Sequence, residues 1–302
     1  MKICVAAPDS KIANLAILKI AAYHLAKGDT VKWYEPLFDE DAGLLYISKV
    51  FTFTPDFVYA PNCEVIKGGT GYDVKSALPP EIEAITDISK AYETLYPEID
   101  YSIIFTTRGC VRHCSFCLVP TKEGLIHDER MVTLNPNGKY IQILDNNFFS
   151  SSSWRSRLEA IKAFNQPLDF NQGIDIRAIT DEQCAELGKI NIKRSIHFAW
   201  DSLKDENAVM NGIKRITKYV KPSNLTCYCL VGYENADIVD GDHYRVKKLH
   251  SLGITPFAMG FIDYNTNHER SQSVIDFCRW VNTHIFKSVP FSNYDTSIKG
   301  SL

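Results

Sequence analysis

The sequence lacks a long uninterrupted apolar segment, which argues against both a membrane-spanning helix and a secretory signal. The first residues, MKICVAAPDS, reach Asp9 after an apolar run too short for a signal peptide. The stretch from Leu15 to Ala26 is apolar but contains Lys19 and His24, so it is too short and too polar to cross a bilayer. We therefore expect a cytoplasmic protein that does not act at a membrane.

The chain also lacks an excess of charge of either sign. Its 33 Lys and Arg side chains nearly balance 36 Asp and Glu side chains, and the net charge is -3. This balance argues against a sequence-wide electrostatic attraction for nucleic acid and leaves only a local basic patch as a means of binding it. Nucleic acid is therefore not the favoured partner. Internal repeats and low-complexity runs are absent too.

A disulfide framework is not expected either. The chain has nine cysteines, an odd number, and no secretory signal accompanies them. Cysteines in such a setting are more often metal ligands, catalytic groups or buried side chains. Hydrophobic residues make up 45% of the 302 residues, enough for the core of one large domain or two modest ones.

The first part of the chain alternates strand and helix patterns, which predicts a small doubly wound, Rossmann-like α/β domain over residues 1–80. Leu15, Leu18, Ala22 and Leu25 repeat at helical spacing, and Gly28 stands where a helix would end. The expected strands are short apolar runs: Ile3–Ala7, Thr30–Tyr34, Leu44–Ser48, Phe57–Tyr59 and Val65–Ile66. Residues 81–97 form a polar connector with a helical pattern.

Residues 98–289 repeat the alternation at wider spacing. Six strands separated by helices predict a parallel, partial (β/α) barrel, because a closed barrel has eight. The expected strands are Ser102–Thr106, Tyr140–Leu144, Asp169–Ile174, Arg194–Ala199, Leu225–Val231 and Thr255–Gly260. The expected helices are Trp154–Phe164, Asp181–Ile190, Lys204–Val220, Asp237–Leu252 and His268–His284. Residues 290–302 are expected to form a polar tail.

Three cysteines follow the first strand of this second part. Cys110, Cys114 and Cys117 stand in GCVRHCSFC, and thiolates are the usual ligands of iron–sulfur clusters. A short loop can wrap three thiolates round a cubane cluster and leave the fourth iron open to an external ligand. The alternatives are three buried cysteines or a zinc site. Zinc prefers four protein ligands in structural sites, and His113 could supply the fourth.

The C-x3-C-x2-C spacing, with Phe116 before the last cysteine, resembles the radical S-adenosylmethionine superfamily. The resemblance implies a [4Fe–4S] cluster on Cys110, Cys114 and Cys117. It also implies that S-adenosylmethionine binds the fourth iron and is cleaved reductively to a 5′-deoxyadenosyl radical. An electron donor such as flavodoxin or ferredoxin would be the partner. By the same resemblance, the backbone of Phe116 lies against the adenine.

The flanks of the loop resemble two branches of this superfamily. Cys117-Leu118-Val119-Pro120 followed by Gly124 is similar to methylthiotransferases, which usually carry arginine where Glu123 stands here. The segment from Thr107 to Cys110 equally resembles cobalamin-dependent members. The flanks therefore identify the superfamily better than the branch.

The predicted strands end in polar residues, and parallel barrels place their active sites at those ends. Asp145 or Asn146 lies where the superfamily binds the amino group of the cofactor. Arg177 is a candidate partner for its carboxylate or ribose, because guanidinium pairs with carboxylate in a bidentate fork. The other polar strand ends carry Asn147, Asp175, Trp200, Asp201, Tyr233, Glu234, Asp263 and Tyr264.

The N-terminal domain contains a glycine-rich turn, Gly68-Gly69-Thr70-Gly71. Glycine lets backbone approach a ligand closely, although a tight turn without a ligand explains the pattern equally well. Its position resembles the cobalamin-binding domain of radical enzymes, which makes cobalamin a candidate third cofactor on Gly68, Gly69 and Gly71. The usual Asp-x-His-x-x-Gly cobalt signature is absent, because none of the eight histidines follows an Asp by two positions.

These patterns together predict a radical S-adenosylmethionine enzyme, with radical methyl transfer as the leading reaction class. A tRNA methylthiotransferase is the second candidate. The second three-cysteine cluster of those enzymes is not expected, since only Cys4 and Cys63 precede the loop. A non-catalytic iron–sulfur or zinc module that senses metal or redox state is the third candidate. Cys4, Cys184, Cys227, Cys229 and Cys278 are expected in the core.

Overall fold

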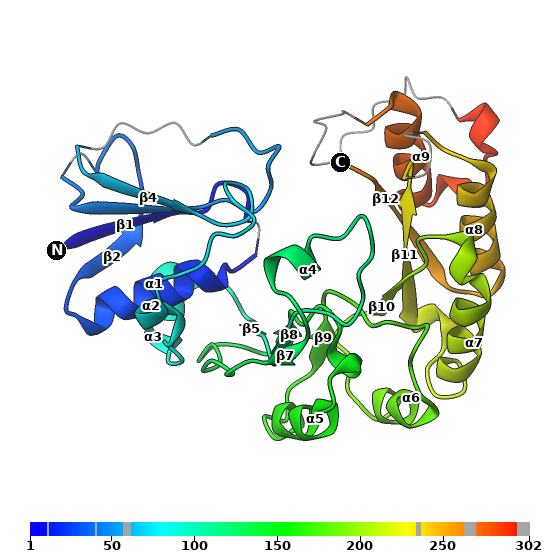
Figure 1. Ribbon diagram of the computed structural model, residues 1–302, viewed down its shortest axis with the longest axis horizontal. Helices are drawn as coiled ribbons and strands as arrows, with labels where there is room; N and C mark the ends of the chain where they lie inside the picture. The colour runs from blue at the N-terminus through cyan, green and yellow to red at the C-terminus, as the bar shows by residue number, and fades with distance from the viewer. Residues whose placement is uncertain (11, 40, 57–61, 234–236, 263–269, 295–302) are drawn as a thin grey trace. The chain divides into compact units, whose positions relative to one another are not determined.

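The computed structural model describes residues 1–10, 12–39, 41–56, 62–233, 237–262 and 270–294. It divides into two compact units, 1–171 and 172–302, and we describe each by itself. The described residues form a mixed α/β protein with three parallel sheets and no closed barrel (Figure 1). In these ranges no helix is long and apolar enough to cross a membrane.

The first unit begins with a four-stranded parallel sheet in the order β2-β1-β3-β4. Chain order reverses between β1 and β3, as in doubly wound sheets. The N-cap Asn14 starts helix α1 by accepting a hydrogen bond from the Ile17 N–H. The elements are β1 (Lys2–Ala6), α1 (Leu15–Ala26), β2 (Thr30–Trp33), β3 (Leu44–Ser48) and β4 (Glu64–Gly68). Four predicted strands are therefore confirmed within two residues, and Phe57–Tyr59 lies outside the described residues.

A small core holds this sheet together. Cys4, Leu45 and Ile47 are almost fully buried and pack with Ala6, Tyr34 and Ala42. Cys4 is thus a core residue, as predicted. The connector that follows consists of two short helices, α2 (Pro80–Glu83) and α3 (Ser89–Leu95). Tyr92 of α3 is buried, and its hydroxyl accepts a hydrogen bond from the Ile103 N–H of the next sheet at 2.9 Å.

The second sheet of the first unit is parallel, with β8 between β5 and β9. Its strands are short, and all of their residues are buried: β5 (Ser102–Ile104), β8 (Ile141–Ile143) and β9 (Leu168–Phe170). Between β5 and β8 lie β6 (Thr107–Arg108), α4 (Val119–Lys122) and β7 (His127–Asp128). After β8 come the 3₁₀ turn η1 (Phe148–Ser150) and α5 (Trp154–Lys162).

The predicted strand Asp169–Ile174 is wrong in its extent. β9 ends at Phe170, and Gly173 then has a φ of +87°, a backbone conformation that interrupts an extended strand. An added Cβ at Gly173 would lie 2.9 Å from the His197 carbonyl oxygen. Ile174 then forms an isolated parallel bridge to Phe198 in the second unit.

The second unit is a three-stranded parallel sheet in the order β10-β11-β12. Its strands are β10 (Ile196–Ala199), β11 (Leu225–Val231) and β12 (Thr255–Gly260). Its α-helices are α6 (Asp181–Leu187), α7 (Glu206–Ile216), α8 (Asp240–Ser251) and α9 (Gln272–Asn282). The 3₁₀ turns are η2 (Leu203–Asp205), η3 (Pro222–Asn224), η4 (Ile285–Lys287) and η5 (Phe291–Asn293). β11 and β12 match their predicted bounds.

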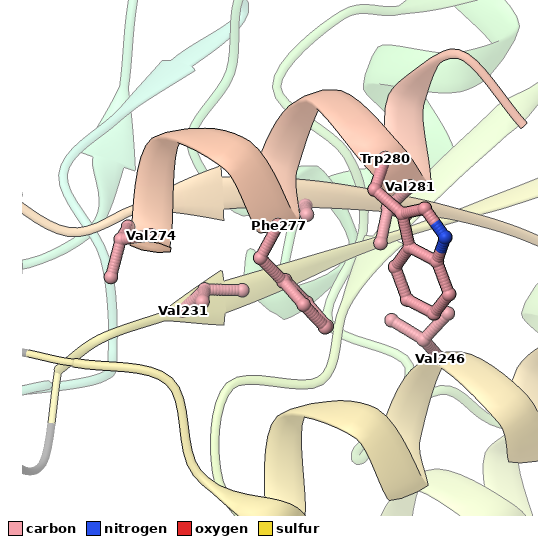
Figure 2. Packing of buried hydrophobic residues seen from close by; sticks show 7 residues of the cluster. Val231, Val246, Val274, Phe277, Trp280 and Val281 are labelled. Atoms are coloured by element: carbon pink, nitrogen blue, oxygen red, sulfur yellow. The ribbon is translucent and has the colours of Figure 1, made fainter. Parts of the chain in front are cut away.

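The core of this unit lies where α8 and α9 pack on the sheet. Phe277 and Trp280 of α9 point toward Val231 of β11 and Val246 of α8 (Figure 2). Phe291, at the start of the predicted tail, packs against this cluster. The tail residues 295–302 and His268, the predicted first residue of α9, lie outside the described residues. Cys184, Cys227 and Cys229 are fully buried as predicted, and Cys278 is half-buried.

The six strands predicted for residues 98–289 are therefore present in the predicted order, three in each unit. Their union into one partial barrel stays a prediction, as do the domain boundaries at residues 80, 97 and 289.

Candidate functional site: the cysteine loop of the first unit

The cysteine loop is closed at its base by a two-stranded antiparallel pair. Thr107 and Arg108 of β6 pair with Asp128 and His127 of β7. Gly109 has a φ of +77°, and an added Cβ would lie 2.4 Å from the Leu125 carbonyl oxygen. Only glycine allows the two ends of the loop to approach this closely. The loop therefore leaves and re-enters the fold at one narrow base.

All three cysteines of the loop are half-buried thiols. The Cys117 N–H donates a hydrogen bond to the Cys114 carbonyl at 3.0 Å, forming a tight turn. Within the described ranges, no group of three His, Cys, Asp or Glu side chains is gathered as a metal site. The thiols thus share one short loop without converging. Phe116 is half-buried in the same loop, and His113, the alternative zinc ligand, is exposed.

Asp145 follows β8 and holds the chain just before the cysteine loop. Its carboxylate accepts hydrogen bonds from the backbone N–H and the hydroxyl of both Thr106 and Thr107, at 2.6–2.9 Å. Burial raises the pKa of this carboxyl, and the threonine hydrogen bonds oppose the rise. Four donors occupy most of its acceptor capacity. In this structure Asp145 anchors the loop, and its contact with a cofactor amino group stays a prediction.

Asn146 holds the loop through Glu123. Its side-chain amide donates to Glu123 Oε2 at 2.6 Å, and the same oxygen accepts from the Gly109 N–H at 3.0 Å. Glu123 Oε1 accepts from Arg108 Nη1 at 3.1 Å. Arg108 also donates from Nε to Glu129 Oε2 at 3.0 Å. The Glu123 carboxylate, near the far end of the loop, is therefore bonded both to Gly109 at the start of the loop and to Asn146 after β8.

Asn147 contacts a cysteine directly. Its side-chain Nδ2 donates to Cys110 Sγ at 3.6 Å, and the Arg112 N–H donates to the same sulfur at 3.3 Å. Asn147 is only 3% exposed, and its Oδ1 is buried with no hydrogen-bond partner in the described part of the chain. Asp145, Asn146 and Asn147 thus hold three points of the loop in succession.

Glu123 and Asn147 are the site residues that sequence reasoning missed. Glu123 was visible as a departure from the usual arginine before the glycine, but its partners were not. Asn147 belonged to the polar strand end and carried no signal that separated it from its neighbours.

The predicted glycine site is shaped by packing within the first unit. Gly69 has a φ of +92°, and an added Cβ would lie 2.3 Å from the Lys49 carbonyl oxygen. At Gly71 an added Cβ would lie 2.7 Å from Lys49 Cγ, whereas at Gly68 it would meet only Ser76 Oγ at 3.4 Å. The contact with Lys49 accounts for glycine at positions 69 and 71 without a ligand. Cobalamin binding there stays a prediction.

A hydrogen bond links this part of the first unit to the cysteine loop. The Lys122 ammonium, in helix α4 of the loop, donates to the carbonyl oxygen of Ser76. The Ser76 hydroxyl in turn accepts from the Gly69 N–H at 3.3 Å. Ser76 thus connects the glycine turn to the loop helix.

Arg177 lies in the second unit and is paired there. Its guanidinium donates to Asp175 Oδ1 at 2.8 Å and to Asp205 Oδ2 at 2.9 Å. Burial lowers the pKa of Arg177, but the two carboxylates outweigh it and raise the value overall. The Arg177 side chain is therefore a cation held between two carboxylates, with Nε donating to Asp175 and Nη1 donating to Asp205. Its contact with a cofactor stays a prediction.

The other predicted strand ends of the second unit are buried to different degrees. Trp200 is fully buried and donates from its indole to the Ser202 carbonyl at 2.9 Å, so it belongs to the core. Asp201 accepts from the Leu230 N–H at 3.2 Å, and burial raises its pKa. Asp201 and Arg245 line a small pocket together with Tyr233 and Gly232. Glu234, Asp263 and Tyr264 lie outside the described residues.

Comparison with known proteins adds no assignment. No family model matches the chain, and a search of curated proteins finds no match. The assignment of function therefore rests on the cysteine loop itself.

Proposed function

We propose that this chain is a radical S-adenosylmethionine enzyme whose cluster is bound by Cys110, Cys114 and Cys117. The observation that carries the proposal is that a C-x3-C-x2-C loop is held at the ends of parallel strands by three consecutive side chains. Parallel α/β sheets bind ligands at this edge, outside the carboxyl ends of their strands.

The chemistry of the donor set fits an iron–sulfur cluster. Three thiolates on one loop match the usual ligands of such clusters, and a structural zinc site would call for a fourth protein ligand. The half-buried thiols are accessible to incoming metal, and Asn147 already donates to one of them. A [4Fe–4S] cluster bound there would supply the electron that cleaves S-adenosylmethionine to the 5′-deoxyadenosyl radical.

The chain's own residues would orient and shield this site. Asp145 fixes the backbone before the loop, and Glu123 closes the loop at its base. Asn147 keeps a buried amide oxygen that can accept a hydrogen bond from a bound ligand. We include radical methyl transfer in the proposal, because the N-terminal sheet has the doubly wound order expected of the cobalamin-binding-like domain that precedes the barrel in radical enzymes.

The test begins with anaerobic reconstitution with iron and sulfide, followed by metal analysis and electron paramagnetic resonance. We expect about four irons per chain, as a cubane cluster requires. Replacing Cys110, Cys114 and Cys117 together by Ala should abolish the cluster. Cys63→Ala is the matched control, because Cys63 is also half-buried but lies outside the loop. Full iron content in the triple variant would show that the cysteine loop does not bind the cluster.

A second measurement, of S-adenosylmethionine cleavage, distinguishes an enzyme from a non-catalytic sensor. The reduced protein, given S-adenosylmethionine, should release 5′-deoxyadenosine, which chromatography detects. A cluster that forms but never cleaves the cofactor would favour a redox-sensing module, and stoichiometric zinc in place of iron would favour a structural metal site. A methylated or a methylthiolated product would then distinguish the two transferase reactions.

A further inference from the structure

Asn147 is a buried amide at the N-cap of η1, and its side chain makes no capping hydrogen bond there. It is 3% exposed, and its Oδ1 has no hydrogen-bond partner among the described residues. Buried polar groups in native proteins are nearly always paired, and exceptions concentrate at functional sites. An apolar side chain of similar shape would fill the same space without leaving an oxygen unpaired. The amide therefore has another use.

The contact made by the amide nitrogen indicates that use. Asn147 Nδ2 donates to Cys110 Sγ at 3.6 Å, within the longer range of hydrogen bonds to sulfur. Its neighbour Asn146 directs the corresponding amide to Glu123 instead. The three residues at the end of β8 thus have different targets, and within the described structure Asn147 alone of the three reaches a thiol.

We propose that Asn147 is a positioning residue that holds Cys110 and, through its amide, raises the reduction potential of the cluster bound by that thiolate. The inference rests on the proposed iron–sulfur function. Hydrogen bonds to cluster sulfurs are one of the factors that set reduction potential. Reduction adds one negative charge, so a donor to sulfur stabilises the reduced form more than the oxidised form.

The test is the midpoint potential of the reconstituted cluster, measured by a redox titration followed by electron paramagnetic resonance. Asn147→Leu removes the donor while keeping a similar shape. We expect the equilibrium constant for reduction to fall about tenfold, equal to about 59 mV for a one-electron couple. Asn147→Asp exchanges the donor for an acceptor and should lower the potential at least as far.

Asn171→Leu is the matched control. Asn171 follows β9 in the same sheet, and its amide oxygen accepts from Gln142 Nε2 at 3.0 Å. The same substitution there should leave the potential at the wild-type value. An unchanged potential in Asn147→Leu, or an equal fall in Asn171→Leu, would overturn the proposal.

Three further outcomes are decisive. Loss of iron from both Asn147 variants, with wild-type unfolding midpoints, would support the proposal because the amide would then be needed to hold the thiolate. Loss of iron together with a lowered unfolding midpoint would overturn it, since Asn147 would then serve the fold. Absence of a cluster from the wild-type chain would instead refute the iron–sulfur function itself.

Discussion

Glu123 should control how often the cysteine loop opens. Its carboxylate accepts from the Gly109 N–H, the Asn146 amide and the Arg108 guanidinium, and its side chain is only 13% exposed. A hydrogen bond to a charged group contributes about 1.5–3 kcal/mol. Arg108 keeps Glu129 as a second partner, and water can reach the freed donors. We therefore expect Glu123→Ala to lower the free energy of loop opening by about 2–4 kcal/mol.

Hydrogen–deuterium exchange measures this opening directly, since exchange of a protected amide follows the local opening equilibrium. At about 1.4 kcal/mol per factor of ten, amides from Gly109 through Cys117 should exchange roughly 30- to 1,000-fold faster in Glu123→Ala. Glu123→Gln keeps an acceptor for Gly109 but turns an NH₂ group toward another donor, so its effect should be intermediate.

Glu129→Gln is the matched control. It removes the same charge beside Arg108 but contacts neither Gly109 nor Asn146 in the described structure. The Glu129 side chain forms a partly exposed ion pair with Arg108, so the substitution should change the free energy of loop opening by about 1 kcal/mol or less. Equal acceleration in Glu129→Gln and Glu123→Ala would show that net charge, and not the three hydrogen bonds, holds the loop. Unchanged exchange in Glu123→Ala would refute the reasoning outright.

Three further predictions concern stability, each measured by urea or thermal unfolding. Asp145→Asn places an NH₂ group against donors and should cost about 2–4 kcal/mol; an unchanged midpoint would contradict its anchoring role. Gly69→Ala should lower the free energy of unfolding by about 2–4 kcal/mol. Gly28 has a φ of +82° and open space around it, so Gly28→Ala should lower it by only about 1 kcal/mol. Equal losses in the two variants would show that the clash with Lys49 is relieved. Burial opposes ionisation of Asp39, but hydrogen bonds from Lys2 and neighbouring groups lower its pKa from 3.8 to about 2. Its ionised form therefore stabilises the fold above about pH 4, and about 1–2 kcal/mol is lost as pH falls toward 2; Asp39→Asn should remove this pH dependence, and a retained dependence would assign it to another group.

The strands were predictable where apolar runs were continuous or alternated cleanly. In β11 every second residue from Leu225 to Val231 is buried, and its bounds matched the prediction. Helix starts were less predictable because they depend on a cap. Helix α9 begins after Ser271, whose hydroxyl accepts from the Val274 N–H, and this cap was not recognised in the sequence. The predicted helix Lys204–Val220 begins instead as the 3₁₀ turn η2 before α7 starts at Glu206.

The cysteines of the loop were found from spacing because all three lie within one short segment. The residues that hold the loop were not, because their contacts join distant parts of the chain. Asn147 contacts Cys110 across 37 residues, and Asn146 contacts Glu123 across 23. Both contacts depend on the register of β5 against β8, and no local pattern specifies that register.

Asp145, Asn146 and Asn147, at the end of β8, couple ligand binding at the loop to the folding of the strand that carries them. Any ion or small molecule that binds the loop only while it is held at Thr107, Gly109 and Cys110 must also favour the folded strand that carries these three residues. The gain in folding free energy is RT ln(1 + [L]/Kd), about 2.7 kcal/mol when the concentration is 100 times Kd. A rise in the unfolding temperature of the sheet β5-β8-β9 can therefore report which ligand binds the loop, whatever reaction that ligand takes part in.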